Sequence, residues 1–366
     1  MQKPTQPIAK VFAIIFAILF VITALASILL LTTVKQAFNP EVYKQALLST
    51  GVYERLPQLI GEQIVFSVNR NPCLQDPTSC TEEQLVSTPA YLSVVDASEW
   101  ATILSGLVDS DWLMTQMESV IDQVSTFLST PGQPFRMDIS LVELKNRLRG
   151  EAGYLAILDL LNSLEPCTTI DLLSLPAAAL NADNPINLPL CRPSETVLKL
   201  GESAIRESLK VIADKIPDNT AALIETSTPG LDNSLAVTQR SLQLLRTLAW
   251  ISPLIPLCLL LVITLLVVRN LKGFLTWWGI PLIYVSFLLF MCSLLVTPTV
   301  GGLVSSRVNA IGLAPGWIEI IQNVILSIIY SFRNSLNLQA GILLLVGCLM
   351  FVASKLIHNR SDIGSA

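Results

Sequence analysis

The stretch Val11–Val34, VFAIIFAILFVITALASILLLTTV, decides the fold class, because it carries no charge and is bounded by Lys10 and Lys35. At a rise of about 1.5 Å per residue, a helix of this length crosses a hydrocarbon core of about 30 Å. A cleaved signal peptide is the alternative, since Ala24-Leu25-Ala26 resembles a cleavage site. The apolar run continues well beyond that site, whereas a signal's apolar region has about 7–15 residues. We therefore expect an uncleaved membrane anchor.

Three further apolar runs lie near the C-terminus. The sequence therefore predicts an all-α integral membrane protein with four transmembrane helices and a large, mostly helical extracytoplasmic domain between the first and the second. The predicted segments are an N-terminal tail (1–10), helix 1 (11–34), the extracytoplasmic domain (35–246), helix 2 (247–268), a turn (269–276), helix 3 (277–300), an outer loop (301–335), helix 4 (336–354) and a C-terminal tail (355–366). Pro253 and Pro256 are expected to bend helix 2 near its start.

Charge is distributed unevenly along the chain. Only 14% of the residues are charged, whereas a soluble domain has about 25%. Residues 35–246 contain 15 Lys and Arg against 26 Asp and Glu, a net charge of −11, while the remainder carries +6. An acidic domain repels phosphate groups, so nucleic acid is a poor partner. The expected partners are the lipid bilayer and an unidentified protein.

Basic residues in the short segments predict the orientation, since long loops translocate largely regardless of charge. Six lie in the tails and in the turn after helix 2: Lys3, Lys10, Arg269, Lys272, Lys355 and Arg360. The loop after helix 3 offers two, Arg307 and Arg333. We therefore expect a multi-pass protein of the cell membrane with both termini in the cytoplasm.

Segment 317–332 is predicted to be an amphipathic helix that lies along the outer face of the membrane. Isoleucines form one face, and polar residues recur on the other at three- and four-residue steps. These are Glu319, Gln322, Asn323, Ser327 and Ser331. An extension of helix 4 also fits this stripe, and a fifth membrane crossing is the less favoured alternative. Glu319 is the single ionisable residue in an apolar segment, so it is a candidate functional residue for gating or binding. The favoured explanation is the plainer one, a polar stripe turned to water.

Four of the seven cysteines, Cys73, Cys80, Cys167 and Cys191, lie in the predicted extracytoplasmic domain. An even number in an oxidising compartment indicates disulfides, and four cysteines allow three connectivities. The pairing Cys73–Cys80 and Cys167–Cys191 is favoured because each pair closes a loop that contains proline. Four unpaired cysteines are the alternative. The remaining three fall singly in predicted spans: Cys258, Cys292 and Cys348.

The sequence of the extracytoplasmic domain predicts a mostly helical structure. The signals are Asn39-Pro40-Glu41 before a helix to Leu48, a second helix at 52–68, capping boxes at Thr81–Gln84 and Ser140–Glu143, a periodic segment at 111–128, and helices at 194–216 and from Asp232 into helix 2. Residues 135–141 alternate as a short strand would, although no partner strand is evident. Residues 165–193 carry five prolines and predict a long loop.

The segments NPEVYK (39–44) and VYERLP (52–57), just after an N-terminal anchor, resemble uncharacterised bacterial multi-span membrane proteins. This resemblance covers about the first fifth of the chain. It implies a bacterial origin and no particular activity.

Residues for catalysis are scarce. His358, the only histidine, lies in the C-terminal tail, which argues against Ser-His-Asp or Cys-His chemistry in the large domain. No phosphate-binding loop or nucleophile elbow occurs. The carboxylate pairs Asp109/Asp111 and Glu82/Glu83 are typical of helix starts. We therefore expect no enzymatic activity, no cofactor and no metal site.

Ala13, Ala17 and Ala24 form a small-residue stripe on the first helix that suits helix packing or self-association. The leading functional hypothesis is a non-enzymatic envelope protein whose large domain binds a protein partner or senses the exterior. A permease-like subunit associated with transport is the runner-up, by analogy of topology alone. A membrane-bound enzyme of unknown reaction is the third.

Overall fold

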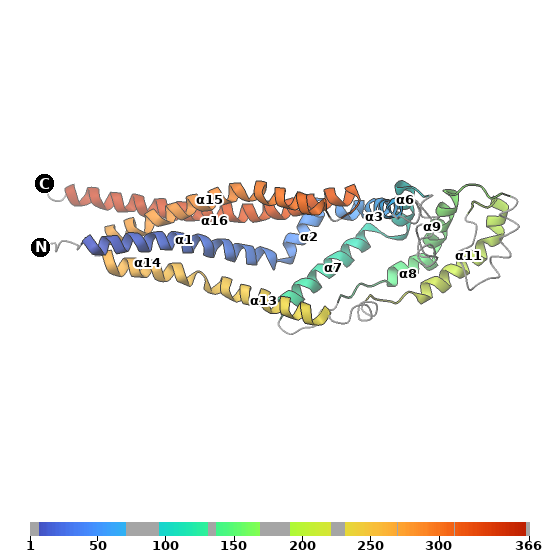
Figure 1. The fold of residues 1–366 in the computed structure, drawn as a ribbon, viewed down its shortest axis with the longest axis horizontal. Helices are drawn as coiled ribbons and strands as arrows, with labels where there is room; N and C mark the ends of the chain where they lie inside the picture. The colour runs from blue at the N-terminus through green and yellow to red at the C-terminus, as the bar shows by residue number, and fades with distance from the viewer. Residues whose placement is uncertain are drawn as a thin grey trace.

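The computed structural model shows an elongated helical molecule whose two termini lie together at one end (Figure 1). It describes residues 7–70, 95–130, 137–168, 191–220, 231–268, 270–310 and 312–363. Within these ranges every regular element is an α-helix, and four helical segments are long and apolar enough to cross a membrane. A further helical domain lies between the first and second of them. The predicted fold class is therefore confirmed.

The apolar helices pack side by side in the half of the molecule that holds the termini, and we call them the bundle (Figure 1). They are α1 (Pro7–Ala37), α14 (Leu254–Val267), α15 (Leu271–Val308) and α16 (Pro315–Ile363), and α13 (Leu231–Ile251), which carries Arg240 and Arg246, leads into α14. Their buried core consists of Phe20, Ala24, Leu260, Ile263, Val285, Leu289, Leu336 and Ala340.

The second span bends at one of the two expected prolines. α13 ends at Ile251, and α14 begins at Leu254 with Pro253 as its N-cap residue. Proline has no N–H to donate to the preceding turn and disfavours helical geometry in the residue before it, so the helix is interrupted there. Pro256 lies in the first turn of α14, where a missing N–H removes no helical hydrogen bond, and it causes no break.

Two glycines bring α15 and α16 close together. A Cβ atom on Gly279 would lie 3.1 Å from the carbonyl oxygen of Gly347, and one on Gly347 would lie 2.8 Å from Cγ1 of Ile283. Small residues permit such close approach of helix backbones in a membrane. Sequence reasoning named the alanines of helix 1 and missed this pair, although both residues stand within predicted spans.

Polar side chains in the bundle bond across helices. The pairs are Ser27 with Ser252 (2.9 Å), Thr32 with Gln339 (3.0 Å), Gln36 with Ser335 (2.7 Å) and Ser293 with Asn337 (2.7 Å). Hydrocarbon offers no alternative partners, so these bonds fix the positions of α1, α15, α16 and the connection between α13 and α14, each contributing about 0.6 kcal/mol on average.

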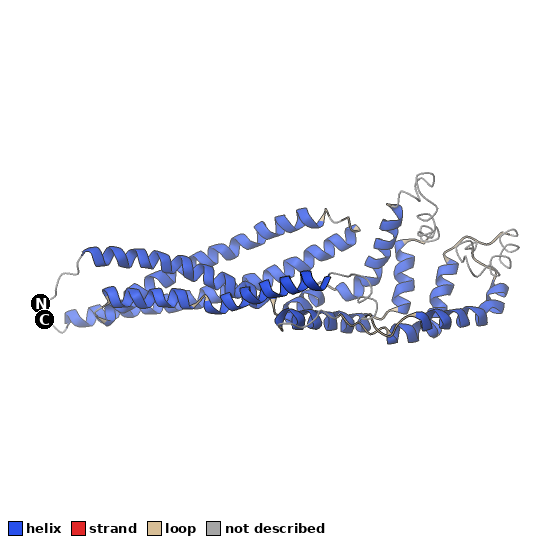
Figure 2. Cartoon of the chain, turned by 60° about the horizontal axis from the view of Figure 1, so that its bottom comes forward, coloured by secondary structure: helices blue, strands red, loops and turns tan. Residues whose placement is uncertain are grey.

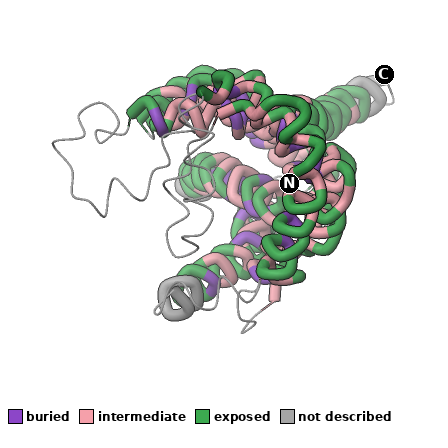
Figure 3. Tube along the Cα trace, turned by 90° about the vertical axis from the view of Figure 1, so that its right-hand side faces the viewer, coloured by how far each residue is buried: buried purple, intermediate pink, exposed green. Residues whose placement is uncertain are grey.

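The other half of the molecule, which we call the distal domain, consists of shorter helices (Figure 2). They are α2 (Pro40–Ser49), α3 (Val52–Asn69), α6 (Ala97–Leu107), α7 (Ser110–Ser129), α8 (Val142–Arg149), α9 (Glu151–Asn162) and α11 (Glu195–Lys215). These bounds match the predicted helices at 40–48, 52–68, 111–128 and 194–216 to within two residues. Buried positions form short stripes where these helices touch, and exposed positions dominate elsewhere (Figure 3).

The start of α2 confirms the local sequence signals. Asn39 is the N-cap residue, and its side chain accepts a hydrogen bond from the N–H of Glu41 at 3.2 Å. Pro40 occupies the first helical position, where its fixed φ suits the helix. Gly51 separates α2 from α3 with a φ of +62°, in the left-handed region that glycine adopts without strain. These residues set the sharp turn between the two helices.

The predicted strand at 135–141 can be followed only from residue 137, because 131–136 lie outside the described residues. Residues 137–141 form no regular strand. What forms is an isolated antiparallel bridge between Ser140 and Asn219. The alternating pattern therefore indicated a segment that pairs with another part of the chain, although at one position only. Its partner was missed because a single bridge leaves no periodic signal in the sequence.

The predicted capping box at Ser140 and Glu143 is wrong. α8 begins at Val142 with Leu141 as its N-cap residue, and no side chain caps the helix. The N–H of Ser140 donates to Oε1 of Gln116 at 3.0 Å, so Ser140 belongs to the bridge and not to the helix. The other predicted capping box, at 81–84, lies outside the described residues.

Segment 317–332 is not a separate helix. It forms the first part of α16, which runs without a break from Pro315 to Ile363. α15 likewise continues to Val308, so the expected outer loop is reduced to residues 309–314. The expectation of a distinct interfacial helix is therefore wrong, and the alternative, an extension of the fourth span, is what the structure has. The reason is that its polar stripe contacts the distal domain.

Candidate functional site

Arg333 and Lys355 divide α16 into a span and an extension. The 21 residues between them carry no charge, which at about 1.5 Å per residue matches a hydrocarbon core of about 30 Å. The residues from Pro315 to Phe332 continue the same helix for about 27 Å beyond it. α15 pairs with this extension, and the distal domain packs on it.

One membrane boundary is marked by basic side chains stacked on aromatic rings. Lys35 lies over Trp250 (5.7 Å to the centroid), Arg246 over Phe38 (5.6 Å) and Arg333 over Tyr330 (5.1 Å). Cationic and aromatic side chains gather at membrane–water interfaces. Beyond this level α2 and α3 meet the α16 extension. We call that contact the junction.

The junction has a small apolar core. Ile320 of α16 is buried against Val52, Leu56 and Leu59 of α3. The N–H of Ala314, just before α16, donates to Oε1 of Gln63 at 2.9 Å. The N–H groups at the start of a helix have no partner within the helix, and the Gln63 side chain of α3 supplies one here. These contacts hold α3 against the start of α16.

Glu319, the candidate from the sequence, lies at the edge of the junction. Its Oε1 is 3.3 Å from Nη1 of Arg55, and the side chains are 60% and 39% exposed. An exposed ion pair of this kind contributes about 0–1 kcal/mol. Glu319 thus has a partner in the distal domain, and its pairing favours one register of α3 on α16 without supplying much stability.

A polar pocket of about 340 Å³ lies between α2 and α16, next to Tyr330. Its polar residues are Gln45, Ser49, Ser327, Ser331 and Asn334. The Ser49 and Ser327 hydroxyls are 3.2 Å apart. This uncharged lining suits water or a small neutral molecule. Two members of the predicted polar stripe, Ser327 and Ser331, therefore face α2.

Tyr53 is the most deeply buried phenol of the junction, at 3% exposure, and its hydroxyl has no partner among the described residues. Burial raises the pKa of this phenol, and the nearby charge of Glu118 raises it further. Because the hydroxyl stays protonated at neutral pH, it is unsuited to act as a base.

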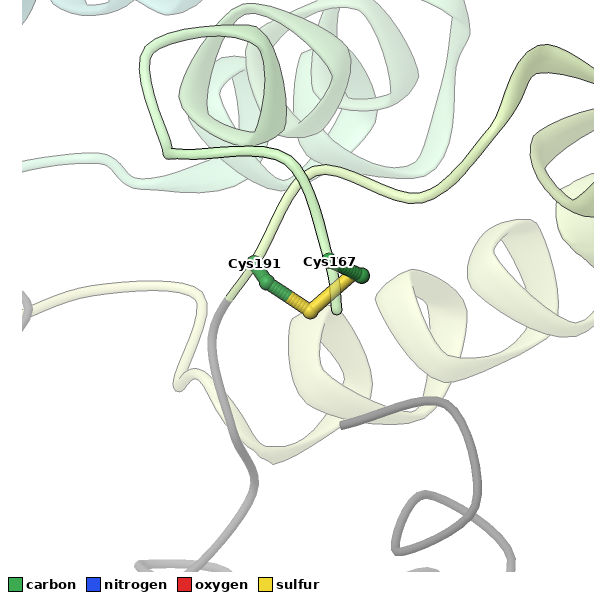
Figure 4. The surroundings of a disulfide bond; sticks show 2 residues. All are labelled: Cys167 and Cys191. Atoms are coloured by element: carbon green, nitrogen blue, oxygen red, sulfur yellow. A yellow bond between two sulfur atoms is a disulfide. The ribbon is translucent and has the colours of Figure 1, made fainter. Parts of the chain in front are cut away.

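The four predicted disulfide cysteines have different outcomes. Cys167 and Cys191 form a disulfide with Cα atoms 4.8 Å apart, which ties the end of α9 to the start of α11 (Figure 4). Cys73 and Cys80 lie outside the described residues, so their bridge stays a prediction. The three cysteines of the spans are free, as expected: Cys258, Cys292 and Cys348.

The alanine stripe of α1 faces the inside of the bundle. Ala13 and Ala24 are 0% and 5% exposed, and Ala24 belongs to the buried core. Ala17 packs partly against that core and lines a groove beside α15. Two of the three alanines are therefore occupied by contacts within the chain, which leaves them unavailable to a second copy.

The carboxylate pairs were expected at the starts of helices, and this is supported for Asp109 and Asp111. Asp109 is the N-cap residue of α7 and its Oδ2 lies 3.3 Å from Nη2 of Arg147; Asp111 lies in the first turn of the same helix. Glu82 and Glu83 lie outside the described residues. Among the residues that are described, no group of three His, Cys, Asp or Glu side chains is placed to hold a metal ion.

α11 is attached to its neighbours by ion pairs and by two buried apolar residues, Leu209 (4% exposed) and Ala213 (0%). Arg206 pairs with Glu151 at 2.7 Å and stacks over the ring of Tyr154 at 4.2 Å, and Arg149 pairs with Asp214. In an ordinary surface helix the apolar stripe faces the neighbours and the charges face water. α11 follows this rule at Leu209 and Ala213, but it also has apolar residues that no neighbour covers.

These exposed apolar side chains of α11 lie at the end of the molecule opposite the termini (Figure 1). We call them the α11 face: Val197 (41% exposed), Leu200 (79%), Val211 (50%) and Ile212 (53%). Exposed apolar patches of this kind mark surfaces that bind other proteins. Sequence reasoning missed the α11 face because periodicity shows that a helix has an apolar side and not which side its neighbours cover.

Comparison with protein-family models, curated proteins and solved structures gives no match to this chain.

Proposed function

We propose that this chain is a non-enzymatic protein of a bacterial cell envelope whose distal domain lies outside the cytoplasm and binds a protein partner through the α11 face. The observation that carries the proposal is the exposure of Leu200 and the other apolar residues of the α11 face, on a helix that is held to its neighbours by Leu209, Ala213 and ion pairs. A side chain of this size exposed in water gains about 1.5–3 kcal/mol when a partner buries it.

A matched pair of variants tests the binding surface. Leu200→Asp is expected to abolish recovery of the partner when the full chain is cross-linked in native membranes, purified and analysed by mass spectrometry. Leu48→Asp alters a comparably exposed leucine (51%) on α2 and is expected to leave recovery unchanged. Identical recovery from wild type and both variants would overturn the proposal. Loss of a hot-spot side chain lowers affinity by about thirtyfold or more.

The orientation is part of the same proposal, and the six-to-two distribution of basic residues supports it. Reporter fusions after Asn270 and at the C-terminus are expected to be active in the cytoplasm, and one after Ser129 is expected to be active outside. A cytoplasmic signal at Ser129 contradicts the arrangement.

One observation favours the second candidate, a permease-like subunit. α15 and α16 pass without a break from the end with the termini to the junction, so displacement of one end is carried to the other (Figure 1). The short connection between α14 and α15 offers little surface for an ATPase to bind. Co-purification of an ATPase with the wild type and with Leu200→Asp alike would favour this candidate.

A further inference from the structure

A groove of about 750 Å³, which we call the α1/α15 groove, runs between α1 and α15 within the bundle. Its lining residues include Ile14, Ile18 and Ile22 on α1 and Ile280, Tyr284 and Phe287 on α15. Ile18 is 57% exposed and Tyr284 is 61% exposed, so the groove is open on its outer side. Both helices are long and apolar enough to cross a membrane, so the groove opens to lipid and not to water.

Tyr284 lies near the middle of the span on α15. It follows Lys272, which marks one membrane boundary, by twelve residues, or about 18 Å of helix. Towards the other boundary, Ser293 bonds to Asn337 at 2.7 Å, and Asn337 stands one turn of α16 from Arg333. The helix from Tyr284 to Ser293 and that further turn together span about 20 Å. Tyr284 is therefore about equally far from both edges of the hydrocarbon core.

The Tyr284 hydroxyl has no hydrogen-bond partner among the described residues. The Thr23 hydroxyl, at a similar depth on α1, donates to the carbonyl oxygen of Leu19 at 2.8 Å, one turn back along its own helix. A tyrosine ring holds its hydroxyl too far from its own backbone for such a bond. Lipid chains offer no partner, and the side chain is too short to reach the headgroups from this depth. The hydroxyl is therefore free to bind a molecule that enters the groove.

Two common occupants of the lipid-facing surface suit the groove poorly. A transmembrane helix of another chain packs through small residues, whereas most of the groove is lined by large side chains, with Ala17 and Thr276 as exceptions. A phospholipid carries its ester and phosphate oxygens at the edge of the hydrocarbon layer, out of reach of Tyr284. No charged residue lines the groove, so an ion has no partner there. The suitable ligand is neutral and carries a hydrogen-bond acceptor within an apolar body.

We propose that the α1/α15 groove binds a lipid-soluble quinone, with one quinone carbonyl accepting a hydrogen bond from the Tyr284 hydroxyl. A quinone is neutral, dissolves in the hydrocarbon layer and has its acceptors on a flat ring. Trp277 and Phe287 line the groove and offer aromatic surfaces to that ring. Apolar and aromatic walls with few polar groups, enclosing about 300–1,000 Å³, are typical of small-molecule sites. This site is separate from the α11 face, so either proposal can fail without the other.

Titration of the full chain with decylbenzoquinone in phosphatidylcholine nanodiscs tests the hydrogen bond. Quinones quench tryptophan fluorescence on contact, so the Trp277-dependent emission, obtained by difference from Trp277→Phe, is expected to fall to a plateau. Tyr284→Phe keeps the ring and removes the donor, and it is expected to raise the Kd by about fivefold. Tyr330→Phe, at a similarly exposed site (50%) on α16 outside the groove, is the control and is expected to leave the Kd unchanged.

Infrared spectroscopy of the bound quinone separates hydrogen bonding from packing. The carbonyl stretching band is expected at a lower wavenumber in the wild type than in lipid alone, and Tyr284→Phe is expected to abolish this shift. Decylbenzene has the same kind of ring and tail without carbonyl groups. It is expected to compete with the quinone at least about fivefold less well than unlabelled quinone does.

The position of the ligand is tested by narrowing the groove. Ile18→Phe places a larger side chain in the wall and is expected to weaken quenching of Trp277. Ile342→Phe, at a similarly exposed site (56%) on α16, is the control. Circular dichroism and gel filtration of each variant verify that the helices and the folded state are retained.

Four outcomes overturn the proposal. Quenching without a plateau shows that the quinone only collides with the protein from the bilayer. An equal Kd for the wild type and Tyr284→Phe, or a carbonyl shift that persists in that variant, removes the hydrogen bond. Equal competition by decylbenzene shows that the groove selects apolar shape alone. Cross-linking of a photoreactive amino acid at Ile18 to another polypeptide in native membranes shows that a helix occupies the groove.

Discussion

Replacing Gln239 by leucine is expected to loosen the contact between α13 and α7. Gln239 is 4% exposed, and its Nε2 donates to the carbonyl oxygens of Phe127 at 2.7 Å and Thr130 at 2.8 Å. These carbonyls lie at the C-terminal end of α7, where a helix leaves acceptors unpaired. The side chain therefore caps α7 from the helix that leads into the second span.

The expected cost follows from the two bonds. Each contributes about 1 kcal/mol, and a carbonyl left buried without a partner adds to the loss, so the variant is expected to destabilise the end of α7 by about 2–3 kcal/mol. That corresponds to a roughly 30- to 150-fold larger equilibrium constant for local opening. Hydrogen exchange measured by mass spectrometry on peptides from α7 reports this opening directly.

Gln243, one turn further along α13, is the matched control. Its Nε2 is buried and has no partner among the described residues, so Gln243→Leu removes a polar group without breaking a bond. Exchange in α7 is expected to stay unchanged, or to slow. Equal acceleration by both variants would refute the reasoning, because it would show that the glutamine side chains matter through packing alone.

Three further predictions follow from the contacts. Cys191→Ser opens a loop of 24 residues and is expected to lower the stability of the α9–α11 region by roughly 3 kcal/mol, measured by hydrogen exchange. Gly347→Leu is expected to lower the thermal midpoint of the purified protein by separating α15 from α16, whereas Gly341→Leu, whose Cβ meets no atom within 4 Å, is not. The hydrogen bond from Lys145 and its positive charge lower the pKa of Asp218. Stability from this pair is therefore present above the ordinary aspartate pKa and is lost as pH falls below about 4, and Asp218→Asn is expected to flatten the pH dependence of unfolding in that range.

Local signals in the sequence were sufficient for much of the fold. Uncharged runs predicted the four spans, because the length of a helix that crosses hydrocarbon is fixed by the thickness of that layer. Asn39 and Pro40 predicted the start of α2, because capping depends on neighbouring residues alone. The same reasoning failed at Ser140, where a pairing with a residue far along the chain replaced the local cap.

The sequence by itself determined most of the helical segments, although α6 and α9 were missed, and which segments are apolar enough to enter a membrane. It also favoured the Cys167–Cys191 disulfide that the structure has. Only the tertiary structure decided what each helix face contacts. The polar stripe that begins at Glu319 meets α2 and α3 and not the membrane surface, and α11 turns Leu200 away from its neighbours. The physical reason is that a periodic pattern specifies two environments around a helix, whereas the identity of each environment depends on segments distant in the chain.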